Sequence, residues 1–142
     1  MNNKANKVPH IQVDAFPLVD DHFSGVGHYT LGIVTGFDEL AAEGKLTYSL
    51  ITPRYRANRI AKYDLQHYKS IVRNPVPSKI VRGFMKYGWK IPFDLILGKG
   101  FYYFPSFLAW PTWHAKSTVV VHDVTYLAVP ECVDKGNREY LA

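Results

Sequence analysis

A glycine-containing turn at residues 24–30 (SGVGHYT) lies between two segments of different periodicity and constrains the fold more than any other stretch. The preceding residues 10–18 (HIQVDAFPL) are predicted to form a strand. After the turn, apolar residues recur at helical spacing, with Ser24 as a plausible N-cap and Gly44 at the expected helix end. Residues 46–52 (LTYSLIT) are a second strand candidate. This order predicts a βαβ unit and therefore parallel strand pairing.

The two glycines of this turn are each unfavourable in a helix by about 1 kcal/mol relative to alanine, which calls for an explanation. One explanation is a phosphate, because first-turn amides are unpaired, the helix dipole favours an anion and a missing side chain lets a diphosphate approach. Gly25, Val26, Gly27 and His28 are therefore candidate diphosphate-binding residues. The alternative is tight packing of the turn against a neighbouring strand. Position 30 is Thr30, so the third glycine of the dinucleotide-binding pattern is missing and a free-standing dinucleotide-binding domain is disfavoured.

Length and composition indicate one globular domain, with 142 residues of which 47% are hydrophobic. Residues 1–9 (MNNKANKVP) have no apolar signal segment and are expected to be a flexible tail before a domain spanning 10–142. No stretch is apolar enough to span a membrane, so we expect a cytoplasmic protein. A single cysteine, Cys132, excludes an internal disulfide. The six histidines lack the spacing of zinc ligands, so no metal is expected.

The net charge of +5 arises mainly from the middle of the chain, where residues 54–90 contain ten lysines and arginines against one acid, Asp64. Such asymmetry indicates an anionic partner. Nucleic acid is the weaker option because no recognised RNA-binding or zinc-finger signature is present. Residues 79–90 (KIVRGFMKYGWK) interleave aromatic and basic side chains, as at a membrane interface, although a core-packing helix with a solvated basic face is the alternative. The candidate contacts to an acceptor or membrane are Arg54, Arg56, Arg82, Lys86 and Trp89.

Further elements are expected downstream of the βαβ unit. Residues 54–68 are interpreted as a loop with room for a short helix, and residues 69–73 as a short strand. A helix is predicted over 78–87 after a proline-containing break. Residues 100–105 (GFYYFP), which are aromatic and bounded by glycine and proline, have the profile of a buried strand.

An uninterrupted run of β-branched residues at 118–121 (TVVV) predicts a strand buried on both faces at the centre of a parallel sheet. His122 and Asp123 follow at its carboxyl end. Open α/β sheets bind ligands outside the carboxyl ends of their strands, so this pair is a candidate catalytic site near the glycine-containing turn. The alternative for His122 is a core histidine whose ring is satisfied by backbone.

Three motifs in order, SGVGHYT, FYYFP and VVVHDVTYLAVPE followed by REYLA, resemble the N-terminal domain of family 4 glycosyltransferases. These are retaining sugar transferases with the GT-B fold. The resemblance covers residues 13–142. It implies an α/β fold, namely a Rossmann-like three-layer domain with a mainly parallel central sheet that forms the N-terminal half of the GT-B fold. It also implies that a C-terminal donor-binding domain with paired glutamates is missing, so the 142 residues should be an inactive fragment.

The same resemblance implies roles for particular residues. The glycine-rich loop of the family approaches the donor diphosphate, which corresponds to Gly25 and Gly27, and the active-site histidine of the family corresponds to His122. Asp123 would orient a loop or contact acceptor hydroxyls. The implied donor is a nucleoside-diphosphate sugar, the acceptor is a glycan or a lipid-linked molecule, and no cofactor is implied. The alternative function is a non-catalytic module that docks on an anionic membrane, at its inner face, or on a phosphorylated ligand through residues 54–90.

Overall fold

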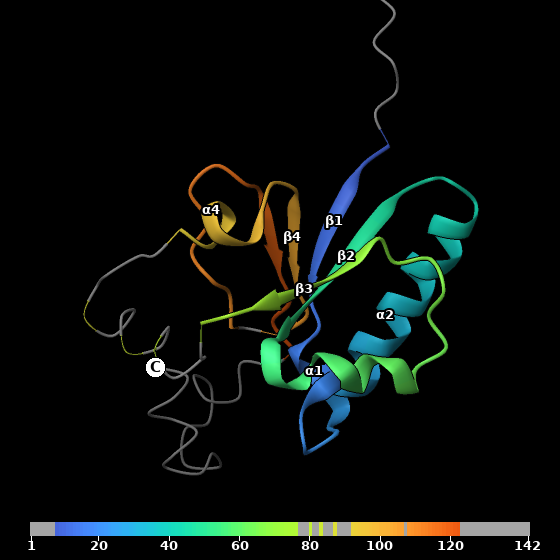
Figure 1. Cartoon of the computed structure of the whole chain (residues 1–142), viewed down its shortest axis with the longest axis horizontal. Helices are drawn as coiled ribbons and strands as arrows, with labels where there is room; N and C mark the ends of the chain where they lie inside the picture. Colours follow the sequence, from blue (N-terminus) through green and yellow to red (C-terminus); the bar gives the residue numbers. More distant parts are fainter. Residues whose placement is uncertain are drawn as a thin grey trace, which may run out of the picture.

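The computed structural model describes residues 8–76, 80, 83, 87, 92–106 and 108–122. They form an α/β domain around a five-stranded, all-parallel sheet in the order β3-β2-β1-β4-β5, which confirms the predicted fold class (Figure 1). The strands are β1 (His10–Asp14), β2 (Thr47–Pro53), β3 (Ser70–Asn74), β4 (Phe101–Phe104) and β5 (Ser117–Val119). The helices are α1 (Phe16–Val19), α2 (Gly25–Ala42), the 3-10 helix η1 (Arg54–Lys62) and α4 (Phe93–Leu97).

The βαβ unit at the start of the chain is confirmed, since β1 and β2 pair in parallel on either side of α2 in sequence. Helix α2 ends as predicted: Gly44 has φ of +70°, and its N–H donates to the Ala41 carbonyl at 2.9 Å. At the other end, Ser24 occupies the N-cap position in extended conformation, but its side chain caps no amide. The helix is 18 residues long and lies along one face of the sheet (Figure 1).

The strand predicted over 10–18 is too long. Strand β1 ends at Asp14, and the chain turns into the short helix α1, which has Pro17 in its first turn. Proline fits there because its fixed φ is helical and its missing N–H would have no intrahelical partner. The apolar residues of this segment therefore belong to two elements, and Leu18 and Val19 enter the core from α1.

Apolar side chains on the two faces of the sheet form separate core clusters, which gives three layers. One cluster joins the sheet to α1, α2 and η1, and its most buried members include Val13, Leu18, Val34, Tyr48, Leu50 and Ile60. The other joins the sheet to α4, and includes Ile51, Phe93, Leu97, Tyr102, Phe104 and Trp110. Alternate residues of β2 and β4 point to opposite clusters, as the period of a strand requires.

A buried carboxylate ties α2 to the sheet and to the loop before β3. Asp38 of α2 accepts hydrogen bonds from the Tyr48 hydroxyl at 2.5 Å, from the N–H groups of Gln66 and His67 at 3.2 and 2.8 Å, and from His67 Nδ1 at 3.0 Å. Burial alone would raise the pKa of Asp38, but these donors outweigh it and lower the pKa to about 2. The ionised form of Asp38 therefore stabilises the fold.

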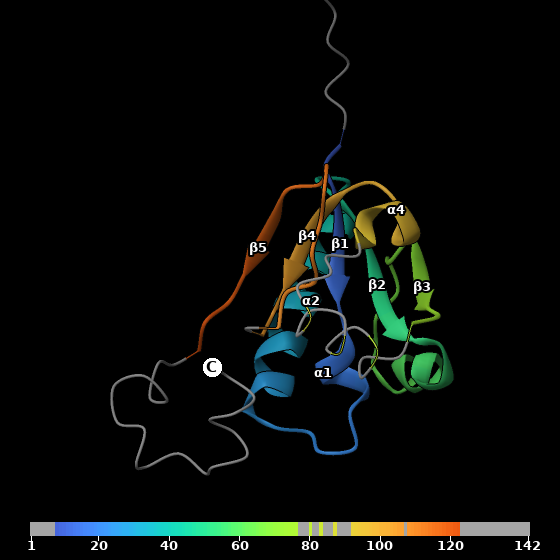
Figure 2. The ribbon, with the colours of Figure 1, turned by 90° about the vertical axis from the view of Figure 1, so that its left-hand side faces the viewer.

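The predicted central position of residues 118–121 is wrong. Strand β5 is the outermost of the described strands and pairs with β4, while β1 occupies the centre. Figure 2 shows β5 at one side of the sheet, and all three of its residues are exposed. A run of β-branched residues indicates a strand, but the neighbours of a strand depend on the rest of the chain.

Predictions for the middle of the chain have mixed outcomes. Helix η1 and strand β3 lie where a loop with a short helix and a short strand were expected, and the aromatic strand predicted at 100–105 is β4. The helix predicted over 78–87 falls largely outside the described residues.

Candidate functional site

Several sequence-predicted residues meet at the carboxyl edge of the sheet. Because β1, β4 and β5 are parallel, the segments that follow them emerge at the same edge, and α2 starts there as well (Figure 2). The ring of Tyr29, in the second turn of α2, packs edge-on against the ring of His122 with centroids 4.9 Å apart. The expected proximity of the glycine-containing turn to His122 is therefore confirmed.

His122 is exposed, and its ring is oriented by the backbone after β4. Its Nε2 lies 2.7 Å from the carbonyl oxygen of Pro105. A carbonyl only accepts hydrogen bonds, so Nε2 must carry the hydrogen. In the neutral ring Nδ1 is then the acceptor, and no described residue donates to it. The two interpretations of His122 are thus compatible: backbone satisfies one nitrogen and the other is left for a ligand.

Tyr29 contacts the ring of His122 and is itself hydrogen-bonded to Tyr103, and sequence reasoning identified neither tyrosine as part of the site. The hydroxyl groups of Tyr29 and Tyr103 lie 2.8 Å apart, which links α2 to β4. Burial, followed by the hydrogen bond with Tyr29, raises the pKa of Tyr103, so the Tyr103 hydroxyl keeps its hydrogen at physiological pH. A contact of this kind leaves no local signal in the sequence, because the two tyrosines lie on different elements.

The two glycines of the turn have different roles. A Cβ at Gly27 would lie 2.9 Å from two ring carbons of Phe23 and 3.1 Å from the carbonyl oxygen of Pro17. Packing therefore requires a glycine at position 27, although its neighbours belong to α1 and the loop after α1 rather than to the strand that was expected. A Cβ at Gly25 would meet nothing within 4 Å, so packing does not require a glycine there.

The first helical turn presents its backbone at the carboxyl edge. The first intrahelical bond starts at His28, whose N–H donates to the Ser24 carbonyl at 3.1 Å. The amides of Gly25, Val26 and Gly27 precede that bond and have no partner among the described residues. The imidazole of His28 is exposed and packs edge-on against Phe23, with ring centroids 4.6 Å apart.

Asp14 is a candidate site residue that sequence reasoning missed. It is the last residue of the central strand, is 3% exposed, and its Oδ1 accepts the Phe16 N–H at 3.1 Å. Burial raises the pKa of Asp14 to about 7. A carboxyl group with such a pKa can donate or accept a hydrogen bond near neutral pH. The signal that could have identified it is a carboxylate closing an apolar strand, at the edge where α/β sheets bind ligands.

The basic residues proposed as ligand contacts differ in their surroundings. The guanidinium of Arg56 is already paired within the protein, with Asp20 at 2.9 Å and Asp21 at 2.5 Å, and its side chain is only 15% exposed, which argues against the predicted contact with an acceptor or membrane. Arg59 also bonds Asp21, at 2.6 Å, so both arginines hold the loop between α1 and α2. Arg54 is exposed. The remaining candidates lie outside the described residues, namely Arg82, Lys86, Trp89 and Asp123.

Comparisons with protein-family models, curated proteins and solved structures find no significant match. Within the described part of the chain, no group of three metal-binding side chains is close enough to hold a metal ion. The helices described here include none with the length and hydropathy needed to cross a lipid bilayer.

Proposed function

We propose that this chain is the N-terminal, acceptor-side domain of a retaining glycosyltransferase of the GT-B type. The full enzyme would transfer a sugar from a nucleoside-diphosphate sugar to a glycan or a lipid-linked acceptor. The proposal rests on the resemblance of three ordered motifs, and the observation that supports it most is the contact between Tyr29 and His122. That contact brings the glycine-containing turn and the candidate histidine to one edge of a parallel sheet, where ligands of such sheets bind.

In this proposal the first turn of α2 contributes to binding the donor diphosphate. The amides of Gly25, Val26 and Gly27 are available as donors, and the positive end of the helix dipole favours the anion. When the bond between the sugar and the diphosphate breaks, the leaving group takes the electron pair and its charge increases. Donors fixed in place before the reaction stabilise that charge without reorganisation. Cations from a second domain would supply the rest.

His122 acts on a hydroxyl group of the sugar or the acceptor. With Nε2–H donated to the Pro105 carbonyl, the neutral ring offers Nδ1 as an acceptor, and a hydroxyl is the matching donor. Tyr29 holds the ring in this orientation.

A transfer assay on the protein joined to a donor-binding domain tests the proposal. We expect a nucleoside-diphosphate sugar from a panel to support transfer with retention, and the 142 residues alone to be inactive. His122→Ala should lower kcat about tenfold or more, which corresponds to the loss of roughly 1.4 kcal/mol of transition-state stabilisation. His114→Ala is a matched control, because His114 lies in the segment before β5, at the opposite edge of the sheet. Equal turnover of the two variants, or no transfer from any donor, would contradict the proposal.

A further inference from the structure

Strand β4 positions His122 through its backbone. The strand pairs with β1 along one edge and with β5 along the other, which holds its residues in register. The pairing continues just beyond β5, since the Val120 N–H donates to the Phe104 carbonyl at 2.9 Å. His122 follows two residues later, and its Nε2 lies 2.7 Å from the Pro105 carbonyl oxygen. The backbone around the end of β4 therefore sets the position of His122 and of one ring nitrogen.

These backbone contacts leave the plane of the imidazole ring to be fixed. The last torsion of a histidine side chain, about the Cβ–Cγ bond, has broad energy wells. Rotation about this bond moves Nδ1 further than Nε2, because Nε2 lies closer to the rotation axis. The hydrogen bond to the Pro105 carbonyl therefore limits the direction of Nδ1 only weakly, although Nδ1 is the nitrogen that is left for a ligand. A second contact has to fix that direction.

The second contact is the ring of Tyr29, which is itself held by Tyr103. The rings of Tyr29 and His122 are nearly perpendicular, at 85°, with centroids 4.9 Å apart. Tyr29 is 37% exposed, so packing alone does not hold its side chain, but its hydroxyl lies 2.8 Å from the hydroxyl of Tyr103 in β4. Tyr103 packs edge-to-face against Phe37 of α2, with ring centroids 5.8 Å apart, and both rings adjoin the core between α2 and the sheet. The contacts therefore run from the core through Tyr103 and Tyr29 to His122.

We propose that Tyr103 is a positioning residue for His122 and acts through Tyr29. Strand β4 and the residue after it then hold the imidazole at two points, directly by the Pro105 carbonyl and indirectly by Tyr103. This inference rests on the proposed glycosyltransferase site, in which Nδ1 accepts a hydrogen bond from a hydroxyl group of the sugar or the acceptor. Hydrogen bonds weaken steeply when donor and acceptor are misaligned, so the direction of Nδ1 decides the strength of that bond.

The ring-proton resonances of His122 test this role in the protein without any ligand. Tyr29→Phe and Tyr103→Phe each remove one hydroxyl of the same hydrogen bond and keep both rings. We expect each variant to shift the His122 resonances, because the ring current that His122 experiences depends on how the Tyr29 ring is held. The double variant should shift them no further than either single variant, since all three lose the same bond. Tyr29→Leu, which also removes the ring, should give the largest shift.

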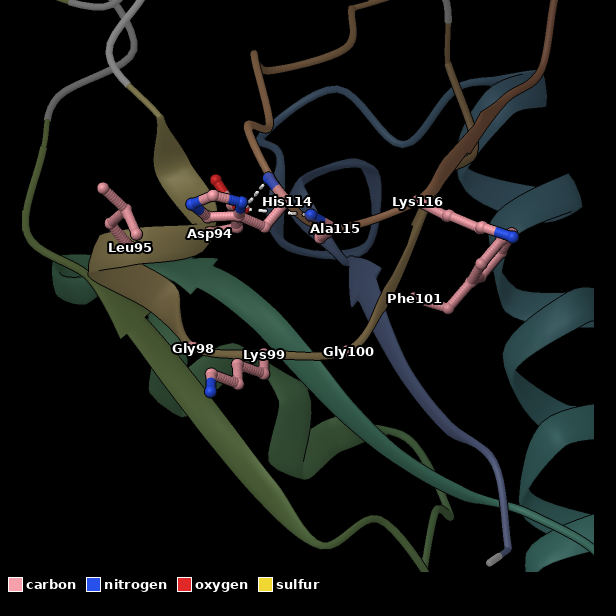
Figure 3. Close-up of a pocket in the computed structure, with 9 residues that line it drawn as sticks. All are labelled: Asp94, Leu95, Gly98, Lys99, Gly100, Phe101, His114, Ala115 and Lys116. Carbon is pink, nitrogen blue, oxygen red and sulfur yellow. Dashed lines mark hydrogen bonds between the residues drawn. The ribbon is translucent and has the colours of Figure 1, made fainter.

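Two controls distinguish positioning from a general loss of stability. Tyr63→Phe removes another hydroxyl that joins two elements, because Tyr63 donates to the Leu18 carbonyl at 2.7 Å, and it should leave the His122 resonances unchanged. His114 is an internal reference in the same spectra, since its N–H donates to Asp94 at 2.7 Å on the other side of the domain (Figure 3). Unchanged His122 resonances in Tyr103→Phe would overturn the proposal. Additive shifts in the double variant, or equal shifts at His114, would overturn it as well.

Kinetics in the protein joined to a donor-binding domain give a second readout. Each hydroxyl variant should lower kcat about three- to tenfold, as expected for one weakened hydrogen bond, and leave the KM for the donor unchanged. Transfer at an unchanged rate in both variants would refute the positioning role and leave the proposed function standing. Absence of transfer by the unchanged protein would refute the proposed function, while the His122 spectra would still decide whether Tyr103 positions the ring. The two failures are therefore distinguishable.

Discussion

Replacement of each turn glycine by alanine should have opposite effects on stability and binding. At Gly27 the added methyl group would lie 2.9 Å from the Phe23 ring and 3.1 Å from the Pro17 carbonyl oxygen. Overpacking of this kind costs about 1 to 3 kcal/mol, and the better helix propensity of alanine returns about 1 kcal/mol. The net loss is therefore about 0 to 2 kcal/mol. The Phe23 side chain is 36% exposed and can shift whereas the Pro17 carbonyl is backbone, so we take the middle of this range, about 1 kcal/mol. This should lower Tm by about 3 °C in a domain of this size.

At Gly25 the methyl group would meet no atom within 4 Å. Gly25→Ala should therefore leave the free energy of unfolding unchanged or raise it by up to about 1 kcal/mol. The same methyl group would stand beside the first-turn amides, where we propose that a diphosphate binds. Loss of one charge-assisted hydrogen bond, worth about 1.5 to 3 kcal/mol, would weaken pyrophosphate binding roughly ten- to hundredfold.

Urea unfolding and amide-resonance titration with pyrophosphate together measure both effects. A double-mutant cycle with Phe23→Ala isolates the clash, because Gly27→Ala should cost less once the ring is removed. If Gly25→Ala bound pyrophosphate as tightly as the unchanged protein, the phosphate-binding interpretation of the turn would be refuted. If Gly27→Ala unfolded at the same urea concentration as the unchanged protein, the packing explanation would be wrong.

Four further predictions concern Asp38, Asp14, His122 and residues 54–90. Because the pKa of Asp38 is lowered on folding, its contribution to the free energy of unfolding is present above the unfolded pKa of about 4 and is lost as the pH falls toward 2. Asp38→Asn should lower the free energy of unfolding by about 2 kcal/mol at neutral pH. It should also flatten the loss of stability at acid pH, as measured by urea unfolding. The raised pKa of Asp14 has the opposite effect on stability: a contribution present below about pH 4 is lost as the pH rises through 7, by up to about 4 kcal/mol. Asp14→Asn should remove this loss. An unchanged dependence of the free energy of unfolding on pH in that variant would contradict the burial argument. Nitrogen chemical shifts of His122 should report hydrogen on Nε2 in the neutral ring, and hydrogen on Nδ1 would refute the Pro105 contact. If residues 54–90 bind membranes, the protein should sediment with anionic vesicles and be released by salt, because each cation near the surface adds about 1 kcal/mol; equal binding to neutral vesicles would eliminate the electrostatic explanation.

The sequence by itself determined the local elements and the pairing of the first two strands. The change from extended to helical periodicity located α2, and Gly44 marked its end, because capping depends on a few adjacent residues. A strand, a helix and a strand in succession leave parallel pairing as the ordinary solution. The carboxyl-edge position of His122 followed from the same rule, since all parallel strands end at one edge.

Only the tertiary structure decided features that depend on distant partners. The β-branched run at 118–121 is compatible with a strand at the edge of a sheet as well as with one at its centre. The strand order of the structure places it at the edge. The residues next to Arg56 in the sequence do not indicate that it pairs with Asp20 and Asp21, which lie in the loop after α1. Gly25 and Gly27 differ because only Gly27 faces Phe23 and Pro17. The pKa of Asp14 is raised because the assembled domain buries its carboxyl group. Periodicity and capping act over a few residues, whereas burial, ion pairing and strand order require the whole domain to be assembled.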